Sequence, residues 1–244
     1  MEQGKILSSG RFDGSYLTRD FVASRFAAEA PLDRAMGLRG DHDNNDGHPG
    51  LSLEAGRVLI RASVLVPLID RPEGLSVLLT QRTDHLHDHA GQVSFPGGRE
   101  EPEDKDAVAT ALREAHEEIG LDPAKVELIG RLDTYITRTS YQVTPVVGLI
   151  RPPMALKPDP FEVADIFEVP LAFVVDPAHH ELRSREFQGS LRQFYVLPHP
   201  DRFIWGATAG MLHTFRRMLQ APTDGSTPTD GSARSDSPAQ TDEP

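Results

Sequence analysis

The fold is decided by residues 91–121, which read GQVSFPGGREEPEDKDAVATALREAHEEIGL. Residues 104–119 of this stretch predict a helix, because apolar side chains recur at helical spacing. That apolar stripe consists of Val108, Leu112, Ala115 and Ile119. Asp104 is expected to cap the start of the helix, and Gly120 to follow its end. A helix with one apolar face packs against another layer, so the stretch favours a layered α/β domain.

The same predicted helix carries a cluster of acids. Glu114, Glu117 and Glu118 stand at i, i+3 and i+4, so they share one face of the helix. Carboxylates held together repel one another, and a hard cation such as Mg²⁺ or Mn²⁺ offsets that repulsion. A solvated acidic face is the alternative for the helix alone. Gly97 and Gly98 favour the metal site, because a loop with paired glycines lets the backbone approach a ligand closely.

These residues resemble a known family. Residues 113–121, REAHEEIGL, are similar to the second half of the Nudix hydrolase box, G-x5-E-x7-R-E-U-x-E-E-x-G-U, in which U is aliphatic. In the first half, counted from Gly98, Asp104 stands at the Glu position and one additional residue precedes Arg113. The resemblance implies a Nudix-like α/β/α sandwich with a mixed β-sheet. It also implies an enzyme that hydrolyses a nucleoside diphosphate linked to another group, with Mg²⁺ or Mn²⁺ as cofactor.

A longer upstream pattern resembles the coenzyme A pyrophosphatase branch of that family. Residues 78–98 follow its signature L-L-T-x-[RT]-[SA]-x3-R-x3-G-x3-F-P-G-G, with Thr83 at the Ser/Ala position and His87 at the second Arg position. The resemblance implies cleavage of coenzyme A or an acyl derivative to adenosine 3′,5′-bisphosphate and phosphopantetheine. ADP-ribose or a dinucleotide is the alternative substrate. A catalytically silent nucleotide-binding module is the alternative from another class of function.

The resemblance also suggests roles for individual residues. Glu114, Glu117 and Glu118 are expected to hold the metal. Glu117, or Glu162 as the second choice, is expected to take the proton from the attacking water, while Arg113 orients the carboxylates. A pyrophosphate needs positive counter-charge and close backbone approach as well as metal. The expected substrate contacts are therefore Arg82, His87, Gly97, Gly98 and Arg99.

Composition narrows the class of protein. The chain has 244 residues, 38% of them hydrophobic, which is enough for one packed domain. Its formal net charge of −12 argues against a nucleic-acid binder and leaves a small nucleotide pyrophosphate as the expected partner. No apolar run reaches the ~20 residues of a membrane span. Cysteine is absent, which excludes disulfides and thiolate sites, so a cytoplasmic protein is expected.

Three segments are expected along the chain. Residues 1–50 form an N-terminal helix and a polar linker, residues 51–220 the Nudix hydrolase domain, and residues 221–244 a disordered acidic tail. The N-terminal helix is predicted over residues 16–30 and a last helix over residues 207–219. Strands are predicted over residues 58–66, 75–80, 125–132, 142–150 and 166–169, with a further hairpin centred on Gly189.

Overall fold

The structure is a computed structural model that describes residues 12–29, 37–41, 58–86, 89–187 and 189–221. The predicted disorder of the acidic tail therefore lies outside the described residues, as does His87. No helix within the described part of the chain is long and apolar enough to cross a membrane.

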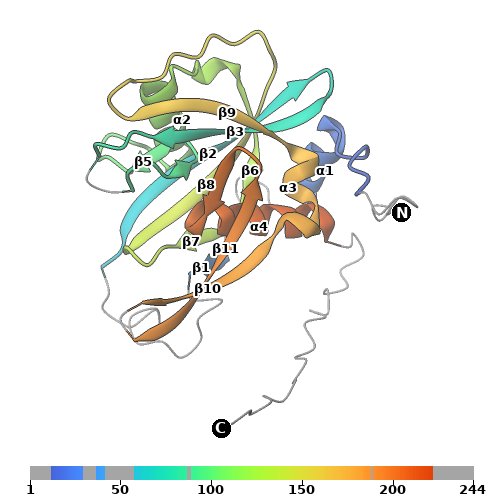
Figure 1. The fold of residues 1–244 in the computed structure, drawn as a ribbon. Coiled ribbons are helices and arrows are strands. Elements are labelled where there is room, and N and C mark those ends of the chain that lie inside the picture. The colour runs from blue at the N-terminus through green and yellow to red at the C-terminus, as the bar shows by residue number, and fades with distance from the viewer. Residues whose placement is uncertain (1–11, 30–36, 42–57, 87–88, 188, 222–244) are drawn as a thin grey trace.

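Helices and strands are interspersed along the chain (Figure 1). The α-helices are α1 (Arg19–Glu29), α2 (Ala107–Ile119), α3 (Leu171–Val175) and α4 (Gly206–Gln220), and short 3₁₀ turns are η1 (Pro123–Lys125) and η2 (Pro177–His179). The larger sheet contains β1 (Leu38–Gly40), β2 (Ile60–Arg71), β3 (Gly74–Arg82), β4 (Val93–Ser94), β5 (Gly97–Arg99), β6 (Val126–Arg131), β7 (Thr134–Ile136), β8 (Tyr141–Ile150) and β9 (Val163–Pro170). A smaller sheet contains β10 (Glu181–Phe187), β11 (Ser190–His199) and β12 (Arg202–Trp205).

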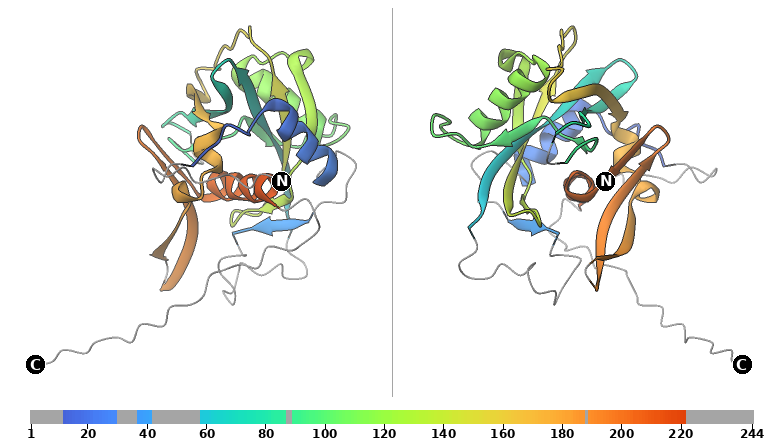
Figure 2. Two further views of the ribbon diagram at one scale, coloured as in Figure 1. Left: turned by 90° about the vertical axis from the view of Figure 1, so that its right-hand side faces the viewer. Right: turned by 60° about the vertical axis from the view of Figure 1, so that its left-hand side comes forward.

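The larger sheet is mixed. Its central strands β2 and β8 run parallel, in register from Ile60 opposite Tyr141 to Ile69 opposite Ile150. The strands β3 and β5 pair antiparallel with β2, while β6 and β7 pair antiparallel with β8. Figure 2 shows α2 on one side of this sheet and α4 on the other. The expected α/β/α sandwich with a mixed sheet is therefore confirmed.

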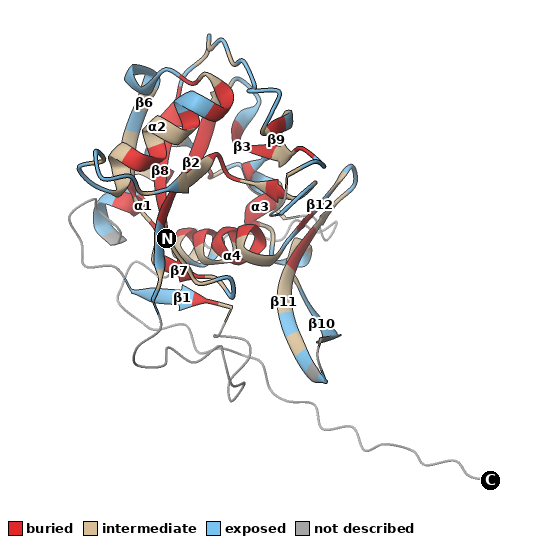
Figure 3. Ribbon diagram, turned by 90° about the vertical axis from the view of Figure 1, so that its left-hand side faces the viewer, coloured by how far each residue is buried: buried red, intermediate tan, exposed pale blue. Residues whose placement is uncertain are grey.

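Each face of the sheet has its own apolar core (Figure 3). On one face the apolar stripe of α2, including Ala115 and Ile119, packs against side chains of β2, β3 and β8. On the other face α1, α3 and α4 share a larger core. The rings of Phe26 on α1 and Phe215 on α4 lie 5.9 Å apart in it, and both side chains are fully buried. The described N-terminal helix is thus part of the main core, and the division at residue 51 stays a prediction.

The helix that carries the acids begins later than predicted. It starts at Ala107, because Asp106 takes the cap position and its side chain accepts a hydrogen bond from the backbone N–H of Ala109. The expectation that Asp104 caps the helix is wrong, since its carboxylate instead binds Arg113. At the other end Gly120 adopts φ 66°, the left-handed conformation that favours glycine after a helix.

Other boundaries also differ from the sequence prediction. The N-terminal helix begins at Arg19 instead of residue 16, because the Thr18 hydroxyl accepts from the N–H of Phe21 and ends the preceding turn. Strand β2 continues beyond residue 66 to Arg71 before the turn. Gly97 and Gly98 lie in the short strand β5 and not in a loop, because their backbone pairs with β2.

Candidate active site

Four elements meet where the predicted catalytic residues lie. Strand β5 brings Gly97 and Gly98 against β2, opposite Val64 and Ser63. Helix α2 packs on β5 and β2 and supplies the acidic residues. The end of β3 and the turn that precedes β9 complete the site. The chain therefore builds the site from a helix, strands and a turn that contact one another, which fixes side chains in position.

Glu118 is deeply buried, with only 6% of its side chain exposed. Its Oε2 accepts a hydrogen bond of 3.1 Å from the backbone N–H of Gly97, and Arg82 Nη1 lies 3.8 Å from its Oε1. The pKa of Glu118 is raised to about 8, mainly by burial, with the charges of Glu114 and Glu162 acting in the same direction and the Gly97 N–H and Arg82 acting against it. The site thus holds a buried carboxylate whose charge is not fully compensated.

Glu114 lies one turn earlier on the same helix, against β5. An added Cβ on Gly98 would stand 2.5 Å from Glu114 Oε1, so only glycine leaves room for this carboxylate. Burial also raises the pKa of Glu114, Arg113 opposes that shift, and Glu117 and Glu162 add to it. The carboxylates of Glu114, Glu118 and Glu162 are therefore close enough to repel one another.

Arg113 connects most of the acidic residues. Its guanidinium donates to Asp104 at 2.9 and 3.1 Å, to Glu114 at 3.0 Å and to Glu117 at 2.9 Å. It also donates to the backbone oxygen of Arg99 at 3.0 Å, which ties α2 to β5. The hydrogen bonds from Arg113 hold the pKa of Asp104 at about 2. Arg113 therefore acts as a clamp that sets the orientation of the helix acids.

Glu117 differs from the other two helix acids. Its side chain is 57% exposed and ion-paired with Arg113, so it stands at the rim of the site. Among the described residues, no three His, Asp or Glu side chains are already arranged as a metal-binding group. The raised pKa values of Glu114 and Glu118 have loss of solvation on burial as their main cause, so both carboxylates are held with little water around them. Such carboxylate oxygens fit a hard divalent cation.

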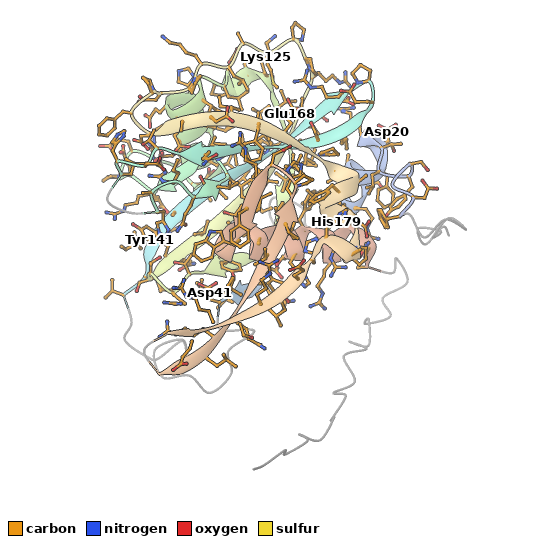
Figure 4. All side chains as sticks on the ribbon, viewed as in Figure 1. Asp20, Asp41, Lys125, Tyr141, Glu168 and His179 are labelled. Carbon is orange, nitrogen blue, oxygen red and sulfur yellow. The ribbon has the colours of Figure 1, made fainter. Side chains whose placement is uncertain are left out.

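The structure brings some of the residues expected to bind substrate next to the helix acids and places others elsewhere. Arg82, Gly97 and Gly98 lie beside the helix acids. The guanidinium of Arg99 instead donates to the hydroxyl of Tyr141 at 2.5 and 3.0 Å and lies 5.4 Å from the centre of that ring. Tyr141, labelled in Figure 4, stands at the start of β8. Arg99 is thus held at the side of the site, and His87 lies outside the described residues.

The turn before β9 carries Glu162, an expected site residue, and what sequence reasoning does not predict is how this turn is fastened to Thr83 and to α2. The backbone N–H of Asp159 donates to the carbonyl of Glu118 at 2.8 Å, which fastens this turn to the end of α2. The backbone N–H of Thr83 donates to the backbone carbonyl of Glu162, and the Thr83 hydroxyl donates to the backbone carbonyl of Phe161. These bonds hold Glu162 near the helix acids. The sequence offers only the prolines at 158 and 160 as a turn signal, with no sign of its partner.

Gly98→Ala should lower kcat/KM by about tenfold to a hundredfold, the usual cost of disturbing a residue that supports a metal ligand. The new methyl group would stand where Glu114 now lies, so that carboxylate must move. Gly37→Ala is the matched control, because its Cβ would also meet a carboxylate, that of Asp133 at 3.0 Å, far from the helix acids. Steady-state kinetics with titrated Mn²⁺ measure the effect. Unchanged activity in Gly98→Ala would show that Glu114 need not occupy its present position.

Comparison with known proteins agrees with this geometry. Residues 59–188 match the model of the NUDIX domain. The uncharacterized Nudix hydrolase NudL of Photorhabdus laumondii is 40% identical over 159 residues, which cover 65% of this chain and 84% of that protein. The protein of the same name from Escherichia coli is 41% identical over 152 residues, or 62% of this chain and 79% of that protein.

Solved structures match the chain at lower sequence identity. A MutT/nudix family protein from Enterococcus faecalis is 19% identical with a TM-score of 0.41, covering 68% of this chain and 64% of that chain. The NUDIX domain of Shewanella oneidensis NrtR, complexed with ADP ribose, is 21% identical with a TM-score of 0.38, covering 53% and 82%. The domain match and the identity to the NudL proteins settle the assignment: this chain belongs to the Nudix hydrolase family.

Proposed function

We propose that this Nudix hydrolase cleaves the pyrophosphate bond of coenzyme A or an acyl-coenzyme A, using Mg²⁺ or Mn²⁺. The products would be adenosine 3′,5′-bisphosphate and phosphopantetheine or its acyl form. The observation that carries the proposal is the buried Glu118, which accepts from Gly97, faces Arg82 and lies close enough to Glu114 and Glu162 for their charges to raise its pKa. A cation and a polyanionic substrate together balance such a site.

The carboxylates of Glu114, Glu117 and Glu118 would hold the metal. When bound, a divalent cation neutralises charge on the pyrophosphate oxygens and makes a bound water more acidic. Arg113 keeps Glu114 and Glu117 in orientation through its hydrogen bonds to both. The Gly97 N–H does the same for Glu118, because it fixes one carboxylate oxygen while the other faces Arg82 at 3.8 Å.

Two further tasks fall to groups at the site. Arg82 offers a guanidinium next to Glu118, in position to bind a pyrophosphate oxygen. Glu117 or Glu162 takes the proton from the attacking water. Glu162 has in its favour the turn that holds it beside Glu114 and Glu118, whereas Glu117 is engaged by Arg113 at the rim. The bond between the bridging oxygen and one phosphorus then breaks as water adds to that phosphorus.

The choice of coenzyme A over other pyrophosphates rests on residues 78–98. Their resemblance to the coenzyme A pyrophosphatase signature extends over β3, β4 and β5. Two residues of this pattern have contacts that support its importance for the site. Arg82 faces Glu118, and Thr83 binds the turn that carries Glu162 through both its N–H and its hydroxyl.

A metal-dependent hydrolysis assay over several nucleotide pyrophosphates tests the proposal. We expect a higher kcat/KM for coenzyme A or an acyl derivative than for ADP-ribose. Chelation with EDTA should abolish the activity, and added Mg²⁺ or Mn²⁺ should restore it. Identification of adenosine 3′,5′-bisphosphate by mass spectrometry establishes which bond breaks. A preference for ADP-ribose would contradict the coenzyme A assignment, and activity that resists chelation would contradict the metal.

A further inference from the structure

We propose that Phe161, supported by His85, is the surface on which the adenine ring of the substrate stacks. The inference rests on the proposed function, because the adenine belongs to the pyrophosphate that the neighbouring acids would cleave. Phe161 would then act as a specificity-determining residue that binds the nucleotide half of the substrate and takes no part in breaking the bond.

Phe161 is unusual in being both exposed and firmly held. As a residue it is 64% exposed, and a single exposed apolar side chain would by itself mean little. Its backbone, however, lies in a tightly bonded turn. Asp159 accepts from the N–H of Phe161 through its side chain at 2.9 Å and from Glu162 and Val163 through its carbonyl at 3.1 and 2.8 Å. A large apolar ring is thus displayed on a rigid turn, although it contributes little to the core.

The position of this turn points to the site. Asp159 donates its N–H to the carbonyl of Glu118, and the Thr83 hydroxyl donates to the carbonyl of Phe161 at 2.8 Å. Phe161 also precedes Glu162, whose charge acts on both Glu114 and Glu118. The turn that carries Phe161 is therefore bonded both to the end of α2 and to Thr83, and its ring is exposed next to Glu162 in the chain.

His85 holds the ring of Phe161 from one side. The two ring centres are 4.9 Å apart and the planes meet at 61°, an edge-to-face contact. This contact restricts rotation of the Phe161 side chain before any ligand binds, which reduces the entropy that a ligand must offset. A flat base fits the remaining exposed face better than the flexible pantetheine arm, because stacking needs two planar surfaces.

Binding of the two product halves distinguishes the nucleotide from the pantetheine side. We expect Phe161→Leu to weaken binding of adenosine 3′,5′-bisphosphate about tenfold, within the range found for loss of one base–aromatic stack. Binding of phosphopantetheine should not change. Phe161→Trp keeps an aromatic face and should bind the bisphosphate without loss of affinity relative to wild type. Isothermal titration calorimetry in the presence of Mg²⁺ measures both ligands.

The matched control is Phe203→Leu, because Phe203 is 50% exposed but lies on β12 of the smaller sheet. It should leave the affinity for both ligands unchanged. In the hydrolysis of coenzyme A, Phe161→Leu should raise KM about tenfold with kcat nearly constant. A thermal melt within error of wild type establishes that Phe161→Leu is folded.

The outcomes separate this inference from the proposed function. Wild-type affinity of Phe161→Leu for the bisphosphate would overturn the stacking, even if the chain hydrolyses coenzyme A. If Phe161→Leu instead loses binding of phosphopantetheine, the stacking is also overturned, because the Phe161 ring would then bind the pantetheine half of the substrate. If the wild type cleaves ADP-ribose but not coenzyme A, the substrate assignment fails, whereas a raised KM for ADP-ribose in Phe161→Leu still supports adenine stacking. A wild type that cleaves coenzyme A yet does not bind the bisphosphate overturns the inference.

Discussion

Glu118→Gln should lower kcat/KM about a thousandfold, because it removes a negative oxygen donor from the proposed metal site. The amide keeps the shape of the side chain and can still accept the hydrogen bond from Gly97. The loss should therefore come from weaker metal binding and not from a displaced strand. Kinetics with titrated Mn²⁺ and direct metal titration by calorimetry measure the two effects separately.

The stability of the metal-free variant distinguishes a functional role from a structural one. Glu118 is buried and its pKa is raised chiefly by loss of solvation, so a neutral amide should leave the metal-free protein equally stable or more stable. Glu127→Gln is the control, since Glu127 is an exposed acid on β6 paired with Arg19. Full activity in Glu118→Gln would remove this residue from the mechanism. Marked unfolding would make its role structural.

Arg113→Met should destabilise the fold by about 3 kcal/mol, the usual cost of leaving a buried carboxylate without its partner. For a chain of this size that corresponds to a fall in Tm of roughly 10 °C. The unpaired carboxylate is Asp104, whose side chain is almost fully buried. Activity should also fall about a hundredfold, because Glu114 and Glu117 lose the group that orients them.

The pH dependence of the same variant identifies the carboxylate responsible. In the wild type Asp104 has a pKa of about 2 against an ordinary value of 3.8, so the unfolded chain binds this proton more tightly than the folded one. The stabilisation is complete above pH 3.8 and is lost as the pH falls towards 2. Arg113→Met should flatten that part of the stability curve. Arg151→Met, which removes an exposed arginine 3.9 Å from Asp70, should change neither Tm nor its acid dependence.

The sequence predicts the helix α2 well, because its signals are local. The apolar stripe, the end at Gly120 and the common face of the helix acids all follow from helical periodicity. The cap was misplaced by two residues, since Asp104 and Asp106 are equally suitable by type. Only the position of Arg113 in space decides between them. Arg113 donates hydrogen bonds to Asp104, so Asp106 is the residue that caps the helix by accepting from the N–H of Ala109.

Residues whose conformation or contacts depend on segments far away in the sequence could not be predicted from local patterns. Gly97 and Gly98 look like loop residues, and they form a strand only because β2 offers them a partner. Arg99 carries a guanidinium of the kind that binds phosphate, yet Tyr141 holds that guanidinium at the side of the site. The turn at Phe161 depends on Thr83, which directly follows β3. Each of these outcomes is set by a contact between segments far apart in the chain.

The parallel pairing of β2 with β8 has a consequence for how the protein acquires its activity as it folds. Parallel neighbours need a long crossover, and here the crossover includes β3, β5 and α2, the segments that carry most of the candidate site. Closing so long a loop is slow, because its entropy is lost before the strand contacts are gained. Helix α2 can form early from local signals, whereas the cradle for Glu114 and Glu118 exists only once β5 has docked on β2. We therefore expect catalytic competence to be acquired late in folding, after most of the secondary structure.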